Sequence, residues 1–343
     1  MPKMRSLPES LIFILGCQRS GTTWLANIFD ASPHTLLFIE PFSPPYGIFP
    51  EFPGTSVFLE ESSPELDHLL TTEMPERLRR NKAFLFARSA TDPKWFRRDR
   101  FLASTARKYG RGWLRRRSCK FELLNLNRTD RSYPIYPKES DPPAWVIKEL
   151  RLAGKLPALM NAFPDAHFIV IMRHPCATVL SILDWFDKGS LGELRRDLET
   201  YLEDVDAQPV SLPYKNEIAL CRNEGLIHKI ALYWRISYET IFEKLKGYSP
   251  AHLVIHEELA TQPIETVRRI ICETDISWSP SLDEYLQYST STETEQPGPI
   301  TTRRESATYY KSWKDRIPEN TRRAILEITE DSYLMPLFEP FYS

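Results

Sequence analysis

The sequence predicts an α/β fold in which a central, mainly parallel sheet is flanked by helices. Residues 11–15 form a short run of branched apolar residues, and residues 166–172 form a longer one. Continuous apolar runs of this length are typical of strands buried on both faces, as in parallel sheets. Each run leads through a turn into a segment with helical spacing. The 343 residues, 42% hydrophobic and 26% charged, suffice for a large core, and we expect a single domain over residues 1–343.

The first strand leads into a glycine-bounded loop. Residues 16–23 match the phosphate-binding pattern G-x-x-x-x-G-K-[ST], except that Thr22 replaces the lysine. A helix is expected from Thr22 or Thr23, because apolar residues recur at helical spacing until Pro33. The segment therefore predicts a strand, an anion-binding loop and a helix, which is a P-loop-like arrangement.

The missing lysine limits which anion the loop can hold. Backbone N–H groups and the positive end of the helix dipole bind an anion whatever side chains the loop carries. The lysine would supply the charge that reaches the β- and γ-phosphates of a nucleoside triphosphate, and Arg19 is the cation that remains in the loop. The sequence therefore disfavours an ATPase or kinase. A glycine turn that holds no ligand is the alternative interpretation.

Two further strands end in charged residues. Residues 35–39 are followed by Glu40, and residues 144–147 are followed by Lys148. Open α/β sheets bind ligands at the carboxyl ends of their strands. Glu40 is therefore a candidate general base, and an exposed turn glutamate is its alternative. A lone lysine would more often be structural, so a catalytic role for Lys148 depends on the other candidate residues near it.

The strand over residues 166–172 ends in Arg173, and a helix is expected over about residues 176–185. A P-loop hydrolase would place a magnesium-binding aspartate at the end of such a strand. Arg173, together with the hydroxyl of Ser181 two helical turns later, instead suits a second phosphate group rather than a metal.

Two long segments carry no transferable motif. Residues 62–127 look mostly helical, and between residues 73 and 120 sixteen Lys and Arg face four Asp and Glu, so this part carries +12 and the remainder −14. We favour a helical insertion with a solvated basic face; nucleic acid, an anionic acceptor and an acidic partner are the alternatives. A second variable insertion, residues 187–227, begins with charged helix-like sequence over 193–206 and suits a lid, a dimer surface or a solvated helix.

Targeting signals and cysteine usage bear on the compartment. No apolar run approaches the ~20 residues of a membrane span, and residues 1–10 lack the apolar middle of a signal peptide. The five cysteines are scattered without paired metal-ligand spacing, which fits a reducing compartment. We therefore expect a cytoplasmic protein without a membrane span, structural zinc or a disulfide framework.

Taken together, these motifs resemble those of sulfotransferases that use 3′-phosphoadenosine 5′-phosphosulfate (PAPS). In that family the first loop holds the 5′-phosphosulfate, and an R-x-P-x-x-x-x-x-S pattern, here Arg173, Pro175 and Ser181, holds the 3′-phosphate. The resemblance implies PAPS as donor, 3′-phosphoadenosine 5′-phosphate (PAP) as product, and no metal. The donor contacts that it implies here are Arg19, Ser20, Gly21, Thr22, Thr23, Trp24, Arg173 and Ser181.

Within the superfamily the chain is more similar to carbohydrate 6-O-sulfotransferases, and more distantly to tyrosylprotein sulfotransferases, than to the cytosolic phenol and steroid enzymes. Glu40 and Pro41 match the E-P pair of the carbohydrate group, and in the tyrosylprotein group the corresponding glutamate is the catalytic base. Residues 146–151 resemble an L-K-E-V-R segment. Residues 252–259 resemble the family's Y-E-D-L strand and turn, with His256 in place of tyrosine.

The end of the chain also resembles the family. Residues 306–318 are similar to its closing W-R-x-x-L segment, and a long helix is expected after them, up to Tyr333. Arg303 and Ser306 fall where the family's carboxyl-terminal loop approaches the donor, so the resemblance implies both as donor contacts.

The function expected from the resemblance is transfer of sulfonate from PAPS to an acceptor hydroxyl, on a carbohydrate or a glycosylated small molecule. Glu40 is the expected base, because Leu150 stands where cytosolic members carry a base histidine, and Lys148 and Arg19 are expected to stabilise charge. The partner is a hydroxyl-bearing acceptor, carbohydrate or anionic, and no nucleic acid is expected. A P-loop nucleotide kinase or hydrolase, and a nucleic-acid-binding protein on a degenerate nucleotide fold, are the alternatives.

Overall fold

Five parallel strands form the centre of the molecule. The computed structural model describes residues 8–42, 48–49, 51–54, 56–80, 143–187, 192–290 and 306–342. Strands pair in the order β2-β3-β1-β4-β5, so β1 lies between β3 and β4 and runs parallel to both. The predicted α/β fold with a parallel sheet is therefore confirmed. The strands are β1 (Ser10–Leu15), β2 (Thr35–Ile39), β3 (Ala144–Glu149), β4 (His167–Met172) and β5 (Ala251–Ile255).

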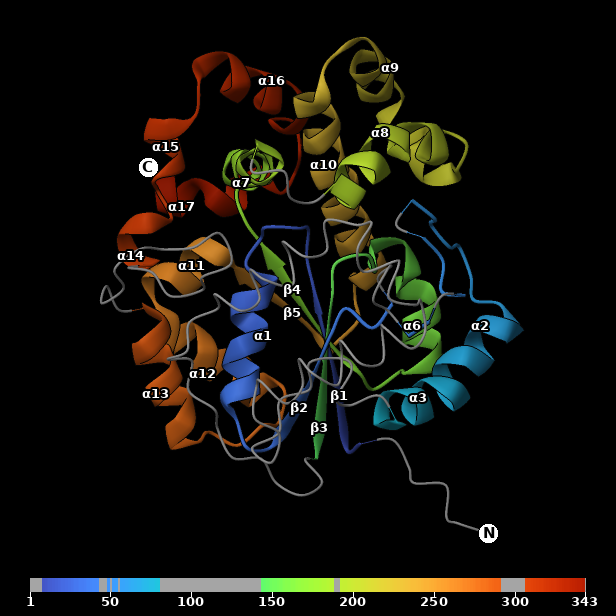
Figure 1. Ribbon diagram of the computed structural model, residues 1–343, viewed down its shortest axis with the longest axis vertical. Helices are drawn as coiled ribbons and strands as arrows, with labels where there is room; N and C mark the ends of the chain where they lie inside the picture. The colour runs from blue at the N-terminus through green and yellow to red at the C-terminus, as the bar shows by residue number, and fades with distance from the viewer. Residues whose placement is uncertain are drawn as a thin grey trace, which may run out of the picture.

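Helices make up most of the remaining described residues (Figure 1). They are α1 (Thr22–Ala31), α2 (Pro64–His68), α3 (Met74–Arg80), α6 (Leu156–Ala162), α7 (Pro175–Asp187), α8 (Gly192–Asp206), α9 (Lys215–Asn223), α10 (Leu226–Leu245), α11 (His256–Thr261), α12 (Pro263–Glu273), α13 (Pro280–Thr290), α14 (Ser306–Tyr309), α15 (Trp313–Arg316), α16 (Glu319–Thr329) and α17 (Glu339–Tyr342). A π-helical turn, Leu69–Glu73, joins α2 to α3, and short 3₁₀ turns cover Ala153–Lys155, Pro209–Tyr214 and Met335–Phe338.

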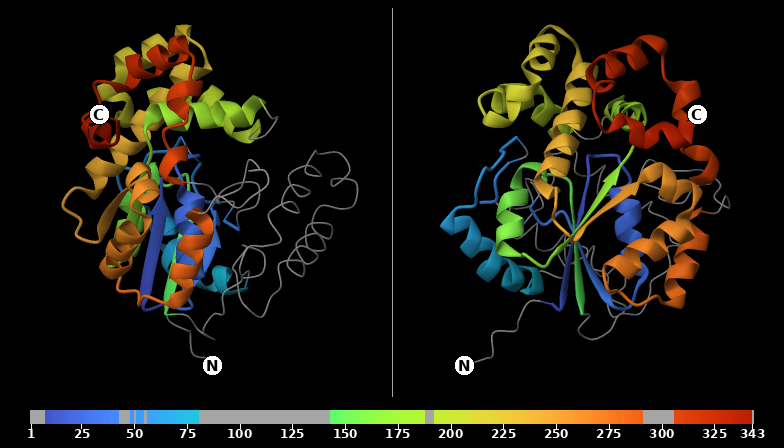
Figure 2. Two further views of the ribbon diagram at one scale, coloured as in Figure 1. Left: turned by 90° about the vertical axis from the view of Figure 1, so that its left-hand side faces the viewer. Right: turned by 180° about the vertical axis from the view of Figure 1, so that it is seen from behind.

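The sheet is the middle of three layers. Successive side chains of β1 point to opposite faces, so Phe13 and Leu15 join one core and Ile12 and Ile14 join the other. The first core is completed by α6 and α10, and the second by α1, α12 and α13. Beyond the carboxyl ends of the strands, α7, α10, α15 and α16 gather into a helical cap (Figures 1 and 2). A ligand at the strand ends is therefore enclosed between the sheet and this cap.

The predicted elements around the central strand are confirmed. The strand over residues 35–39 has the predicted bounds, and the strand predicted over 144–147 extends to Glu149, so it includes Lys148. The helix predicted over about residues 176–185 is α7. The charged segment over 193–206 is helix α8. The segment 62–127 is largely helical as far as Arg80, and the rest of it lies outside the described residues, as does most of the basic stretch 73–120.

The long helix predicted up to Tyr333 is wrong in its last turn. Helix α16 ends at Thr329, and Ser332 donates a backbone hydrogen bond to Thr329 in the turn that follows. This turn buries Leu334 and lets the Tyr333 hydroxyl donate to the carbonyl of Glu239 on α10. Tertiary packing against α10 therefore ends the helix earlier than its periodicity suggests.

No helix within the described ranges is long and apolar enough to cross a membrane. Cys17, Cys176, Cys221 and Cys272 are free thiols, and Cys119 lies outside the described residues.

A pair of histidines lies at the amino-terminal ends of β4 and β5, away from the cap. His167 Nδ1 and His252 Nε2 are 3.0 Å apart, and His252 Nδ1 lies 3.1 Å from Glu273 Oε2. Burial lowers the pKa of both imidazoles, and the neighbouring His252 lowers the pKa of His167 further. Asp275 opposes the lowering of the His167 pKa. Glu273 opposes the lowering of the His252 pKa, and Arg269 supports it. The folded pair therefore binds fewer protons than the unfolded chain does.

Acidification is expected to destabilise the fold through this pair. Both pKa values lie below the unfolded value of 6.5. The contribution of the pair to the free energy of unfolding is therefore complete above that pH and is lost as the pH falls below it. Urea denaturation at pH 8 and at pH 5.5 measures the loss. The variant His167→Gln, which cannot take up this proton, is expected to lose less stability between the two pH values. An unchanged pH dependence in that variant would contradict the assignment.

Candidate functional site

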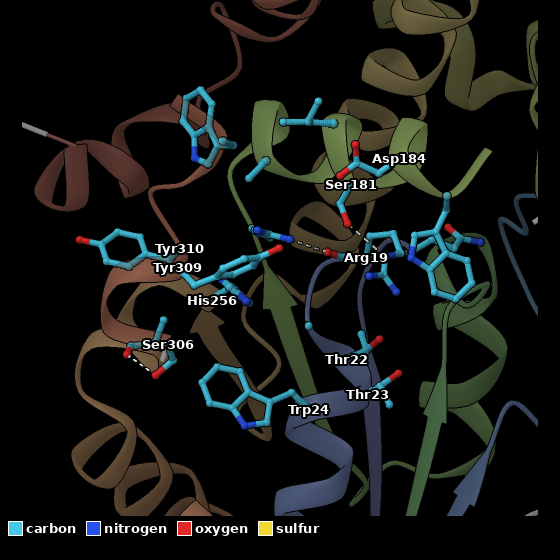
Figure 3. A pocket seen from close by; sticks show the side chains of 18 of the residues that line it. Arg19, Thr22, Thr23, Trp24, Ser181, Asp184, His256, Ser306, Tyr309 and Tyr310 are labelled. Carbon is cyan, nitrogen blue, oxygen red and sulfur yellow. Dashed lines mark hydrogen bonds between the residues drawn. The ribbon is translucent and has the colours of Figure 1, made fainter. Parts of the chain in front are cut away.

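A cavity of about 390 Å³ lies where the carboxyl ends of the strands meet the helical cap (Figure 3). This volume is within the range of small-molecule sites. The loop between β1 and α1 forms its floor, the ends of β2 and β3 form one side, and α7, α11, α14 and α15 form the others. The cavity is thus built by segments from both halves of the chain.

The glycines that bound the first loop are both required by its geometry. A Cβ atom on Gly16 would lie 2.5 Å from the carbonyl oxygen of Ile171 and 2.7 Å from Ser20 Oγ. Gly21 has φ 101°, and a Cβ atom there would lie 2.6 Å from His256 Cδ2. Gly21 is also the N-cap of α1 and has no side chain to cap the first turn. Helix α1 therefore presents its first N–H groups to the cavity, as an anion site requires.

Helix α10 supports this loop from behind. The buried Tyr238 hydroxyl accepts the backbone N–H of Cys17 at 3.1 Å and donates to the carbonyl of Ile171 at 2.9 Å. Tyr233 donates to Gln18 Oε1 at 2.6 Å. Burial raises the pKa of the Cys17 thiol to about 12, so this cysteine is an inert part of the support.

Arg19 projects from the loop across the cavity. Its backbone has φ 69°, an unusual value for a residue with a side chain. The guanidinium Nε donates to Ser181 Oγ at 3.1 Å, and the guanidinium carbon lies 4.4 Å from the ring centre of Trp185 (Figure 3). Arg173 donates through Nη1 to the carbonyl oxygen of Arg19 at 3.3 Å. The loop and the end of β4 are therefore joined through Arg19.

Glu40 and Lys148 form an ion pair between the ends of β2 and β3. The Lys148 side chain is 3% exposed and the Glu40 side chain 35%. Glu40 has φ 52°, and its backbone N–H donates to the carbonyl of Lys148 at 2.7 Å. Backbone strain of this kind at a charged residue is characteristic of functional sites.

The buried Glu149 holds this turn in place. Its Oε2 atom accepts the backbone N–H of Phe42 at 3.0 Å, and its Oε1 atom accepts that of Leu150 at 2.9 Å. Because Phe42 is two residues beyond Glu40, these bonds fix the turn that carries the carboxylate of Glu40.

His174 begins the helix that follows Arg173. Its Nδ1 atom accepts the backbone N–H of Cys176 at 3.2 Å, so it caps α7. The ring stacks on Trp313, with 4.6 Å between centroids. Burial, assisted by Lys314, Arg173 and Arg322, lowers the pKa of His174 to about 3. The imidazole is therefore neutral and structural.

Most of the side chains predicted for the site are brought together. The predicted residues that line the cavity are Arg19, Gly21, Thr22, Thr23, Trp24, Glu40, Lys148, Arg173, Ser181 and Ser306. Ser20 does not line it, because both its N–H and its hydroxyl donate to the carbonyl of Cys17. Arg303 lies outside the described residues.

Several lining residues were not predicted. Asp184 and Trp185 lie on the same face of α7 as Ser181, at spacings of three and four residues, so the helical period contained that signal. Arg316 reaches the cavity from α15 and pairs with Asp184 at 2.6 Å. His256 and Tyr310 join from segments remote in sequence, and their rings carry no local signal of this position.

The assembled groups suit an anionic ligand. Four cationic side chains face one cavity together with the open end of α1: Arg19, Lys148, Arg173 and Arg316. Glu40 supplies a carboxylate within contact of one of them. The arrangement can bind two separate anionic groups and can accept a proton between them.

A family model described as "Sulfotransferase family" matches residues 11–208. No curated protein sequence matches this chain. Among solved structures, the sulfotransferase domain of the Synechococcus PCC 7002 olefin synthase has a TM-score of 0.44 at 16% identity, covering 96% of each chain. A sulfotransferase domain from the curacin biosynthetic pathway has 0.41 at 13%, covering 95% of this chain and 99% of that one. Mouse SULT7A1, complexed with PAP, has 0.45 at 12%, covering 98% and 90%.

A methyl group at Gly16 is expected to destabilise the protein. The variant Gly16→Ala places Cβ against the Ile171 carbonyl, and overpacking of this kind costs about 1–3 kcal/mol. The control is Gly54→Ala, because Gly54 is exposed and nothing lies within 4 Å of its added Cβ. Urea denaturation is expected to show a loss for the first variant and little change for the second. Equal stabilities would contradict the close approach.

Proposed function

This chain belongs to the sulfotransferase family, and we propose that it transfers sulfonate from PAPS to an acceptor hydroxyl. The observation that carries the proposal is the meeting of two anion-binding elements, the loop with Arg19 and the Arg173–Ser181 pair, beside the Glu40–Lys148 ion pair in one cavity. A donor with a 5′-phosphosulfate and a 3′-phosphate presents two anionic groups. The presence of two such elements, with Thr22 in place of the P-loop lysine, supports that donor over a nucleoside triphosphate.

The donor's anionic groups fit the residues present. The N–H groups of the first turn of α1 and the Arg19 guanidinium are assigned to the phosphosulfate. Arg173 and Ser181 are assigned to the 3′-phosphate. Trp24 and Ser306 line the adjoining wall, where the rest of the nucleotide would lie. When bound, the donor supplies an electrophilic sulfur with a phosphate leaving group.

Glu40 is assigned as the general base. Its carboxylate accepts the proton of the acceptor hydroxyl as that oxygen forms a bond to sulfur, while the bond from sulfur to the bridging oxygen breaks. General-base help of this kind contributes ~10²–10⁴ in rate. The turn held by Glu149 keeps Glu40 in the cavity that the loop between β1 and α1 also lines.

Lys148 and Arg19 are assigned to stabilise the charge that develops on the bridging oxygen, together with the hydroxyl groups of Thr22 or Thr23. Lys148 is almost fully buried and is oriented by Glu40, so its charge is poorly screened by water. The protein's own cations and dipoles thus do the work that magnesium does in P-loop kinases.

We assign the acceptor to carbohydrates or glycosylated small molecules. The support for this class is the Glu40–Pro41 pair and the segment 146–151, which resemble those of carbohydrate sulfotransferases. A screen of such acceptors, with amino and phenolic compounds as comparison, tests the assignment.

Calorimetric titration distinguishes the proposed donor from the alternatives. PAP is expected to bind, and Arg173→Ala is expected to remove that binding, whereas ATP with magnesium binds weakly. Preference for ATP with magnesium would overturn the proposal in favour of a nucleotide kinase or hydrolase. Binding of nucleic acid alone, with a steep salt dependence, would favour the nucleic-acid alternative.

Substitution of the base is expected to separate binding from turnover. Glu40→Gln keeps the shape of the side chain and removes its basicity, so turnover is expected to fall by ~10²–10⁴ while PAP affinity stays. Arg19→Ala is expected to lose both. Glu319→Gln, on an exposed turn of α16, is the control. Sulfonate transfer at the parent rate by Glu40→Gln would exclude Glu40 as the base.

A further inference from the structure

A buried carboxylate lies directly behind Arg173. Glu257 is the second residue of α11, has no exposed surface and does not line the cavity. Its Oε1 atom accepts the backbone N–H of His174 at 3.1 Å and the hydroxyl of Tyr342 at 2.8 Å. This carboxylate therefore joins α11 to the start of α7 and to the end of the chain.

The charge of Glu257 is coupled to that of Arg173. Burial raises the pKa of the Glu257 carboxyl, and the positive charge of Arg173 opposes that effect. A buried carboxylate is costly unless a cation and hydrogen-bond donors compensate for it. Arg173 supplies the cation, and His174 and Tyr342 supply the donors.

We propose that Glu257 is a positioning residue that orients Arg173 toward the 3′-phosphate of the donor. It acts on the side chain of Arg173 through its charge, and on the backbone through the adjoining N–H of His174. Because α7 begins at the next residue, the same bond also places the helix that carries Ser181. The inference rests on the proposed PAPS donor and assigns a residue that holds its 3′-phosphate site together.

A ring of contacts closes around this carboxylate. Tyr342 donates to Glu257, Trp313 Nε1 donates to the Tyr342 hydroxyl at 3.0 Å, and Trp313 stacks on His174. Trp313 also lines the cavity. The carboxylate is therefore held in one orientation by α15 and α17, beside the backbone that carries Arg173.

The neighbouring glutamate provides a matched control. Glu258 is next in sequence and lies on the same short helix. It pairs at 3.2 Å with Arg269, which does not line the cavity. The Glu258 side chain is 31% exposed. Glu257→Gln and Glu258→Gln therefore make the same chemical change at a buried and at a partly exposed position of α11.

The test compares two ligands that differ by the 3′-phosphate. Calorimetry measures the Kd of PAP and of 5′-AMP for the full chain and for Arg173→Ala, Glu257→Gln and Glu258→Gln. Glu257→Gln is expected to weaken PAP about tenfold and to leave 5′-AMP unchanged, within the range seen when an outer partner of a ligand-holding side chain is removed. Glu258→Gln is expected to change neither. Arg173→Ala, which removes the phosphate-binding side chain itself, is expected to abolish PAP binding.

Tyr342→Phe is a second test of the same contact, and it can be used even if Glu257→Gln does not fold. This variant removes one hydrogen bond to Glu257 and is expected to weaken PAP selectively, by less than Glu257→Gln. Equal losses for PAP and 5′-AMP would indicate a merely structural role and overturn the inference. Unchanged PAP affinity in the variants would also overturn it. If the parent protein shows no preference for PAP over 5′-AMP, the proposed function itself fails.

Discussion

The parallel pairing of β1 with β3 and β4 is the constraint from which the site follows. Register places Leu15 opposite Glu149 on one side and opposite Val170 on the other, so the ends of three strands lie at one edge. Both faces of these strands are covered by apolar cores, which leaves no room for polar chemistry within the sheet. Charged groups can therefore occupy only the residues at or beyond the strand ends. Side chains that are distant in sequence meet there, as open α/β sheets require.

The cations of the cavity are held in two different ways. Arg19 donates to the neutral hydroxyl of Ser181, and Arg173 donates to the neutral carbonyl of Arg19. When a phosphate replaces one of these neutral acceptors, the arginine gains a stronger, charge-assisted hydrogen bond. Lys148 instead pairs with the carboxylate of Glu40 and is almost completely buried. Arg19 and Arg173 thus make hydrogen bonds that an anion can replace, whereas Lys148 and Glu40 form a preorganised ion pair.

The fold around the first strand could be predicted from the sequence, because each signal there is local. The apolar period defined residues 35–39, and the glycine spacing located the loop. The end of α16 and the wall formed by His256 and Tyr310 depend on packing between distant segments, which no local pattern encodes. Ser20 fits the motif, yet its hydrogen bonds close the loop on itself. A sequence motif identifies the segment that binds, but hydrogen bonding decides which of its atoms face the ligand.

The two halves of the chain contribute different chemistry to the cavity. Residues 11–208, which match the family model, supply Arg19, Lys148 and Arg173 and the carboxylate of Glu40. The wall beyond them is built from residues 256–260 and 306–316 and is rich in aromatic side chains. Glu257 lies where these halves meet, and it accepts hydrogen bonds from both His174 and Tyr342. A buried carboxylate that is compensated from both sides is stable only when both halves are docked. The same buried carboxylate thus joins the aromatic wall to the backbone beside Arg173.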